Sequence, residues 1–208
     1  MSLITNVFEP KLENPFWDFS IDAYRQAGVE SICLQLQDLH SLNVNFVLYC
    51  CWLGKQSMQV SSAEMSLLVK ELRLWDSDVV APLREVRRSL DTIKEEAASL
   101  LRTEVLNCEV QAEKLFQGQI YRFAQVMIEK KIQGELDTVV EDKPLTLENI
   151  HNKRDLSGVR PMEHRDVEFR RFTEYASYNL GQYCDAIGRT KTVGLKKTVT
   201  TLVGLLDD

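Results

Sequence analysis

Apolar residues recur at helical spacing along most of the chain, with almost no alternation of the kind that strands show. From Pro15 to about Ile132 they return every three or four positions, and turn residues separate the segments. The pattern therefore predicts an all-α protein. We expect a multi-helix bundle around one buried central helix, followed by a helical C-terminal extension.

The central helix is predicted where eight apolar residues follow one another, from Phe46 to Leu53. The run is far shorter than the roughly 20 residues that cross a bilayer. Its cysteines, Cys50 and Cys51, lie late in an apolar helix, where burial raises a thiol pKa and opposes reactivity. We expect both to belong to the core, in a helix that ends at Gly54 and is covered on nearly all sides.

Capping residues indicate where the neighbouring helices begin and end. Asn14 before Pro15 predicts the start of a first helix that stops at Gly28, and a second helix should run from Val29 to about His40. The aromatic residues of the first and third helices should form one cluster. This cluster is expected to contain Trp17, Phe19 and Trp52.

Two later helices also have start signals. Ser61 with Glu64 matches a capping box, and Asp78 is expected to cap a fifth helix with Pro82 in its first turn. The apolar positions of that fifth helix predict its inner face, which would be Leu83, Val86, Leu90 and Ile93. One long helix or two should follow from about Glu95 to Ile132, with a weak point at Gly118.

The amino-acid composition changes after Gly134, where polar and turn-forming residues accumulate. We divide the chain into a helical domain (14–132), a polar linker (133–162) with one short helical turn at 147–150, and a helical C-terminal extension (163–208). The extension should contain a helix from about Glu163 to Ile187, closed by Gly188, and a last helix from about Thr190 to Leu206.

Composition and charge narrow the possible partners and compartments. The net charge is −6 without asymmetry between the halves, so we expect no nucleic-acid partner. No transmembrane or secretory segment is evident, and we expect a cytoplasmic protein. Five cysteines and three histidines show no zinc-type spacing, so no metal site or cofactor is predicted.

Several motifs resemble those of an uncharacterised family of small proteobacterial helical proteins, catalogued as a domain of unknown function. The motifs are Phe16-Trp17-x-Phe19-Ser20, Cys33-Leu34-x-Leu36-Gln37-Asp38, Asn43-Val44-Asn45, Trp52-Leu53, Val79-Val80-Ala81-Pro82-Leu83-Arg84 and Arg87-Arg88. They occur in the family's order over roughly residues 14–127. The resemblance implies a helical fold in a bacterial protein and lends no activity.

One candidate binding site is an arginine face. Arg84, Arg87 and Arg88 lie at positions i, i+3 and i+4 of a helix, where guanidinium groups can bind phosphate or an acidic partner. A solvated face paired with nearby carboxylates is the alternative interpretation.

The other candidate site is a polar pocket in the first three helices. Asp18 and Asp22 share a helix face, as do carboxylates that hold Mg²⁺ against a diphosphate. The remaining members of this pocket would be Asp38, His40, Asn43 and Asn45. Surface solvation, helix capping and fixing of the helix register are the structural alternatives for these residues.

No nucleophile with its base, phosphate-cradling loop or dinucleotide-binding motif is evident, so no catalytic residue is predicted. We expect a non-enzymatic helical interaction or adaptor protein with a protein partner. The alternative is a small-molecule or Mg-diphosphate-binding enzyme that uses the polar pocket. The oligomeric state stays open.

Overall fold

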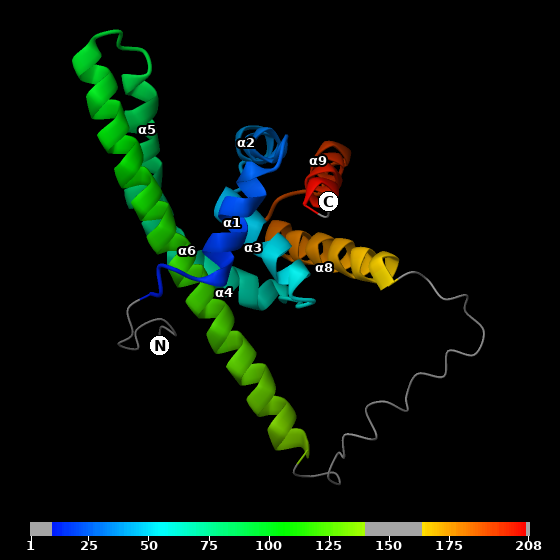
Figure 1. The fold of residues 1–208 in the computed structure, drawn as a ribbon. Helices are drawn as coiled ribbons and strands as arrows, with labels where there is room; N and C mark the ends of the chain where they lie inside the picture. The colour runs from blue at the N-terminus through cyan, green and yellow to red at the C-terminus, as the bar shows by residue number, and fades with distance from the viewer. Residues whose placement is uncertain (1–9, 140–163, 207–208) are drawn as a thin grey trace.

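The computed structural model describes residues 10–139 and 164–206, which form helices and contain no strand (Figure 1). The prediction of an all-α fold is confirmed. The α-helices are α1 (Pro15–Arg25), α2 (Val29–His40), α3 (Val44–Lys55), α4 (Ser62–Trp75), α5 (Ala81–Leu90), α6 (Glu96–Val139), α8 (His164–Ala186) and α9 (Val193–Leu205), with a π-helical turn η1 (Asp76–Val80) between α4 and α5.

The predicted helix starts are confirmed where a side chain caps the backbone. The Asn14 side chain accepts hydrogen bonds from the N–H groups of Phe16 and Trp17, so it satisfies donors that have no partner within α1. Ser61 and Glu64 form both bonds of the capping box at the start of α4. Gly28 separates α1 from α2 with φ +89°, a conformation that favours glycine.

Helix α3 is the buried centre of the bundle, as predicted. Every residue from Val44 to Gly54 is buried. The most extensive contact of α3 is with α8, while α1, α2 and α6 cover other sides. Cys50 and Cys51 are completely buried. Desolvation raises the pKa of both thiols well above the usual value, which keeps them protonated and unreactive.

The expected end of α3 at Gly54 is wrong, because this glycine lies inside the helix and serves close packing. A Cβ atom at Gly54 would lie 2.9 Å from both the backbone nitrogen and the Cβ of Ala176 in α8. Glycine and alanine therefore let the two helix backbones approach closely, which a larger residue would prevent.

The aromatic cluster between α1 and α3 uses Phe16 in place of Trp17. The Phe16 ring centroid lies 5.7 Å from those of Tyr49 and Trp52. Trp17 is not part of the buried core cluster, and the Lys114 ammonium group of α6 lies 5.4 Å from its ring centroid. Phe19 is half-buried against the core. The prediction failed for Trp17 because adjacent helical residues face directions about 100° apart.

The predicted helix cap at Asp78 is also wrong. Helices α4 and α5 are continuous through η1, and Asp78 lies within this π-helical turn. The Trp75 indole N–H donates to the Ala112 backbone oxygen of α6 at 3.1 Å, immediately before the turn. Pro82 lies two residues after this turn, in α5, and donates no N–H to the continuous helix.

The sequence left open whether one long helix or two run from about Glu95 to Ile132, and the structure has one long helix. Helix α6 has 44 residues and is therefore about 66 Å long at 1.5 Å per residue. Gly118 does not interrupt it. Instead the segment before α1 crosses here, since a Cβ atom at Gly118 would lie 3.2 Å from the Lys11 backbone oxygen. The first residues assigned to the linker, 133–139, belong to α6, and its remainder with the turn at 147–150 lies outside the described residues.

The C-terminal helices contribute to the same core as the first ones. Phe172, Ala176 and Leu180 of α8 are buried against α3 and α4, while Leu202 of α9 is buried beside α2. Gly188 ends α8 with φ +66°. None of the described helices is both long and apolar enough to span a bilayer.

Candidate functional site

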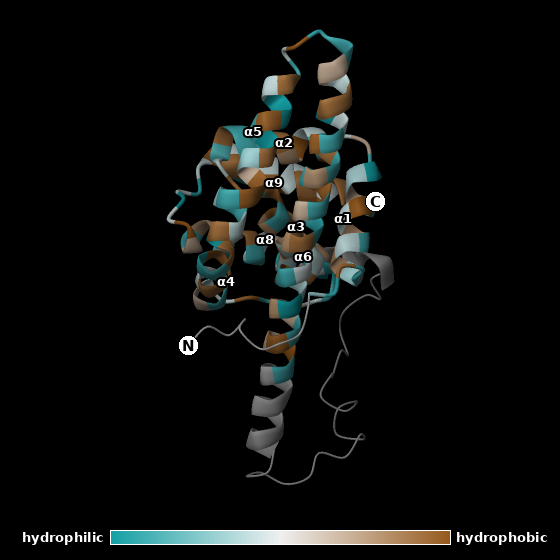
Figure 2. Ribbon diagram, turned by 90° about the vertical axis from the view of Figure 1, so that its left-hand side faces the viewer, coloured by the Kyte–Doolittle hydropathy of each residue, from teal (hydrophilic) through white to brown (hydrophobic). Residues whose placement is uncertain are grey.

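Two antiparallel helices project from the bundle (Figures 1 and 2). They are α5 and the first part of α6, and we call residues 81–111 the α5–α6 arm. The arm's far end, where the chain turns from α5 into α6, lies away from all other helices in both views. Its root rests beside α1 and α2.

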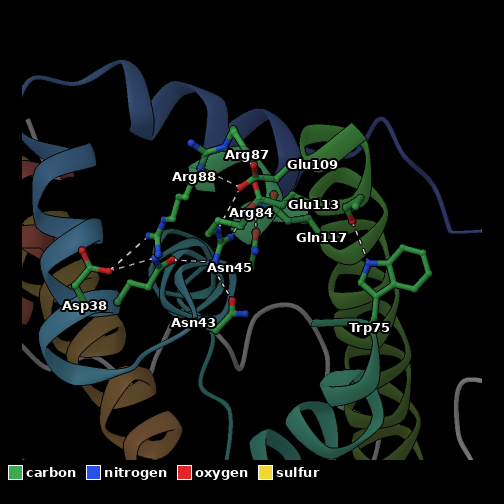
Figure 3. A network of polar contacts seen from close by, with 12 residues as sticks. Asp38, Asn43, Asn45, Trp75, Arg84, Arg87, Arg88, Glu109, Glu113 and Gln117 are labelled. Carbon is green, nitrogen blue, oxygen red and sulfur yellow. Dashed lines mark hydrogen bonds and ion pairs between the residues drawn. The ribbon is translucent and has the colours of Figure 1, made fainter. Parts of the chain in front are cut away.

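Ion pairs hold the two helices of the arm together at its root (Figure 3). The Glu109 carboxylate of α6 accepts from Arg84 Nε at 3.2 Å and from Arg87 Nε at 2.5 Å. Arg84 Nη2 also donates to Glu113 at 2.6 Å. The Glu109 side chain is only 6% exposed, so this is a buried carboxylate that two guanidinium groups neutralise.

The predicted orientation of α5 is therefore wrong. Arg84 and Arg87 turn inward to α6. Val86 and Ile93 of the expected inner face are exposed, and Leu83 and Leu90 are only half-buried. No other described helix covers the apolar side of α5, because the arm is a single pair of helices with no further layer. A buried carboxylate on α6 required its cations instead.

The three predicted arginines are not equivalent. Arg84 and Arg87 are mostly buried and bound to α6, and Arg84 Nη1 donates to Gln37 Oε1 of α2 at 3.2 Å. Arg88 is more than half exposed and lies 3.8 Å from the Asp38 carboxylate. Only Arg88 thus presents much of its guanidinium group to solvent.

A cavity of about 320 Å³ lies where the arm meets the body, and we call it the root cavity. Residues from α1, α2, α3, α5 and α6 line it. They include the apolar side chains of Trp17, Ile21, Leu34, Val44, Leu48 and Val110, and the polar ones of Gln37, Asn45, Arg84, Arg87, Arg88, Glu109, Glu113 and Gln117.

Two buried amides are among the polar residues that line the root cavity. Gln117 Nε2 donates to Asn45 Oδ1 at 2.7 Å, which joins α6 to the first turn of α3. Gln117 is only 4% exposed, and its Oε1 has no hydrogen-bond partner among the described residues. A buried acceptor without a donor costs free energy unless another molecule supplies one.

Burial also changes the proton affinity of groups at the cavity. Desolvation raises the pKa of the Glu113 carboxyl, an effect that the Arg84 cation reduces without cancelling. Burial also raises the pKa of Tyr24, which lines the cavity, well above its usual value, and it raises the pKa of neighbouring Cys33 to about 12. These two groups are therefore neutral hydrogen-bonding partners at physiological pH.

The structure separates the residues of the predicted polar pocket. Asn45 lines the root cavity, but Asp18 and Asp22 are exposed on α1, where Asp22 pairs with Arg25 at 3.0 Å. The Asn43 side chain caps α3. The other two, Asp38 and His40, lie in the last turns of α2 and do not line this cavity. Among the side chains of residues 10–129 and 171–206, no three of His, Cys, Asp or Glu could hold a metal ion.

Three cavity residues of α6 were not predicted from the sequence. Glu109, Glu113 and Gln117 lie four positions apart and therefore share one helix face. Two acidic residues on a face that continues into buried Phe116 and Ile120 were a usable signal. A carboxylate at such a position needs a cation from another helix.

Comparison with known proteins gives one match. The model of a family described as "Protein of unknown function (DUF2390)" matches residues 15–120. This range contains every residue that lines the root cavity and ends within α6, before α8 and α9. No curated protein and no solved structure matches the chain.

Proposed function

The chain belongs to the DUF2390 family, whose model covers slightly more than half of it, and we propose that it is a non-enzymatic interaction protein of the bacterial cytoplasm. Its contact surface is the α5–α6 arm. The partner is a protein that lays an amphipathic helix of mixed charge along the arm.

The exposed apolar residues of the arm carry this proposal. Leu100 and Leu101 are 69% and 53% exposed near the arm's far end, and Val86 and Ile93 are exposed on and just beyond α5. Figure 2 shows hydrophobic residues recurring along the projecting parts of both helices. Exposed apolar residues gathered on one projecting element are typical of protein interaction sites and lower solubility when nothing covers them.

The charges of the arm favour a partner without strong net charge. Residues 81–111 contain five Lys or Arg and six Asp or Glu. Arg84 and Arg87 are bound within the arm, so they do not attract an external anion. Affinity should therefore come from apolar anchors spaced three, four and seven residues apart, as in other complexes of a helix with a groove. Arg88 can contribute one contact at the rim.

The test compares recovery of a partner by one double variant and one single variant, both at exposed leucines. In Leu100→Gln/Leu101→Gln the arm loses its apolar anchors, while folding should change by less than about 0.5 kcal/mol because both residues are exposed. Leu39→Gln is the control, because Leu39 is even more exposed but lies on α2. A photo-crosslinking residue at position 100 reports whether the recovered protein touches the arm.

We expect the double variant to lose the partner, the Leu39→Gln control to keep it, and the crosslink at position 100 to form. Binding should persist in about 0.5 M salt, where exposed ion pairs are screened. Equal recovery by both variants, or release of the partner by salt alone, would contradict the proposal. A crosslink to a second copy of the chain would replace the external partner with self-association.

A further inference from the structure

We propose that the root cavity binds a small uncharged molecule with an apolar body and an N–H or O–H donor at one end. This inference does not depend on what binds the arm. It rests on the size of the cavity, its balanced charge and the unpartnered amide oxygen of Gln117, one of the residues that line it.

The size and walls of the root cavity suit a small organic ligand. Its volume of about 320 Å³ lies at the lower end of the roughly 300–1,000 Å³ that is common for ligand pockets. Trp17, Ile21 and Leu48 provide flat and branched apolar surface in its wall. The charged lining residues lie together at the root of the arm (Figure 3). A ligand with one apolar and one polar end matches this mixed lining.

The charges of the cavity disfavour an anion. Arg84 and Arg87 are each bound to the buried Glu109 carboxylate, and Arg84 is also bound to Glu113. Two guanidinium groups thus face two carboxylates. The third lining cation, Arg88, lies 3.8 Å from the Asp38 carboxylate, so each cation has a carboxylate partner. A phosphate or diphosphate could reach these arginines only by displacing a buried carboxylate, which would leave that carboxylate uncompensated. An uncharged ligand leaves the ion pairs intact.

The Gln117 amide oxygen requires a hydrogen-bond donor from the ligand. The Gln117 amide uses its N–H group on Asn45, and its Oε1 accepts from no described residue. Gln117 is almost completely buried, so bulk water reaches it poorly. An amide, hydroxyl or ring N–H on the ligand would supply the missing hydrogen bond. Such a bond discriminates strongly, because a ligand without the donor leaves the acceptor buried and unpaired.

The test uses two probes that share one apolar body and differ in charge. Indole-3-acetamide is uncharged and carries N–H donors, whereas indole-3-acetate is an anion. Binding to the full-length protein is followed by NMR through the signals of the Trp17 indole and the Gln117 side-chain amide. We expect the amide to bind in the millimolar range or tighter, to shift both signals, and to bind at least tenfold more tightly than the acetate.

Two substitutions at matched positions of α6 localise the binding. Val110→Trp fills the root cavity and should abolish binding of indole-3-acetamide. Leu106→Trp is the control, because Leu106 lies one turn earlier with nearly the same exposure, 37% against 38%, and does not line the cavity. Gln117→Met removes the acceptor and should weaken binding roughly fivefold to tenfold, since one hydrogen bond contributes about 1 kcal/mol.

Several results would overturn the inference. These are no binding of the amide at about 10 mM, tighter binding of the acetate, or equal loss of binding in the Val110→Trp and Leu106→Trp variants. Pyrophosphate with Mg²⁺ is included as a further probe, and a shift of the Gln117 signal by this probe alone would assign the cavity to phosphate ligands. Loss of a protein partner from the arm variants would affect none of these results.

Discussion

Asn179 of α8 should contribute more to stability than any other single polar side chain of the described core. It is completely buried and holds the connection between α3 and α4. Its Oδ1 accepts from the Val60 N–H at 3.0 Å, and its Nδ2 donates to the Met58 backbone oxygen at 2.9 Å and, more weakly, to that of Cys50 at 3.4 Å. The Asn179 side chain thus forms hydrogen bonds with backbone groups of the α3–α4 loop that have no partner within the loop itself.

The expected cost of Asn179→Leu follows from these bonds. Leucine keeps the branched shape of asparagine but is larger, so no cavity forms and the site is somewhat overpacked. The Val60 N–H and the Met58 carbonyl lose their partners. An unsatisfied buried backbone group costs about 1–3 kcal/mol. The Val60 group is fully buried and the Met58 group partly so, and we expect a total loss of about 2–4 kcal/mol. Folded domains of this size are commonly stable by only about 5–15 kcal/mol.

Urea unfolding followed by circular dichroism measures this loss directly. Ser177→Ala is the matched control, because Ser177 is exposed on the same helix and should change the unfolding free energy by less than about 0.5 kcal/mol. A loss below about 1 kcal/mol for Asn179→Leu, at an unchanged denaturant slope, would refute the reasoning. It would mean that the loop finds other partners and that α8 does not hold it.

Three further predictions test the packing and the cavity. Gly54→Ala should destabilise the protein by about 1–2 kcal/mol in urea melts, because the added Cβ meets the backbone of α8 and this overpacking exceeds the gain in helix propensity. A thiol reagent should label exposed Cys108 quickly in the native protein and leave Cys50 and Cys51 unlabelled, and peptide mass spectrometry would reveal the opposite order. The pKa of Glu113 is raised on folding. The stability that its protonated form contributes is therefore fully present below about pH 4.5, and it is lost as the pH rises through the higher pKa of the folded state. Thermal melts across this range should therefore show wild type losing stability relative to Glu113→Gln, and a difference that does not vary with pH would contradict this.

The helix boundaries that depend on short-range bonds could be predicted from the sequence. Asn14 and Ser61 cap helices through partners two or three residues away, so the sequence contains both halves of each interaction. The identity of the central helix was also predictable. A helix that is apolar on every side can bury all its side chains only in the middle of a bundle. The same reasoning placed the adjacent cysteines in the core.

The arrangement of the root cavity depended on contacts that sequence spacing does not reveal. Asn45 and Gln117 lie 72 positions apart, and Arg84 and Glu109 lie 25 apart. The periodicity of α5 alone favoured burial of Leu83 and Val86. The tertiary structure reversed this orientation, because α6 presents a carboxylate that must be neutralised and no third helix covers the apolar side.

Local sequence thus determined which segments are helical and which of them is central, since those outcomes depend on a residue's own bonds and polarity. Tertiary packing decided the rest. Gly54 looked like a helix end but permits the close contact with α8, and Asp78 looked like a cap but lies in a π-helical turn that continues α4 into α5. The physical reason is common to both residues. The short-range free energy of a cap or a helix end is about 1 kcal/mol, and the packing of whole helix faces against each other exceeds it several times over.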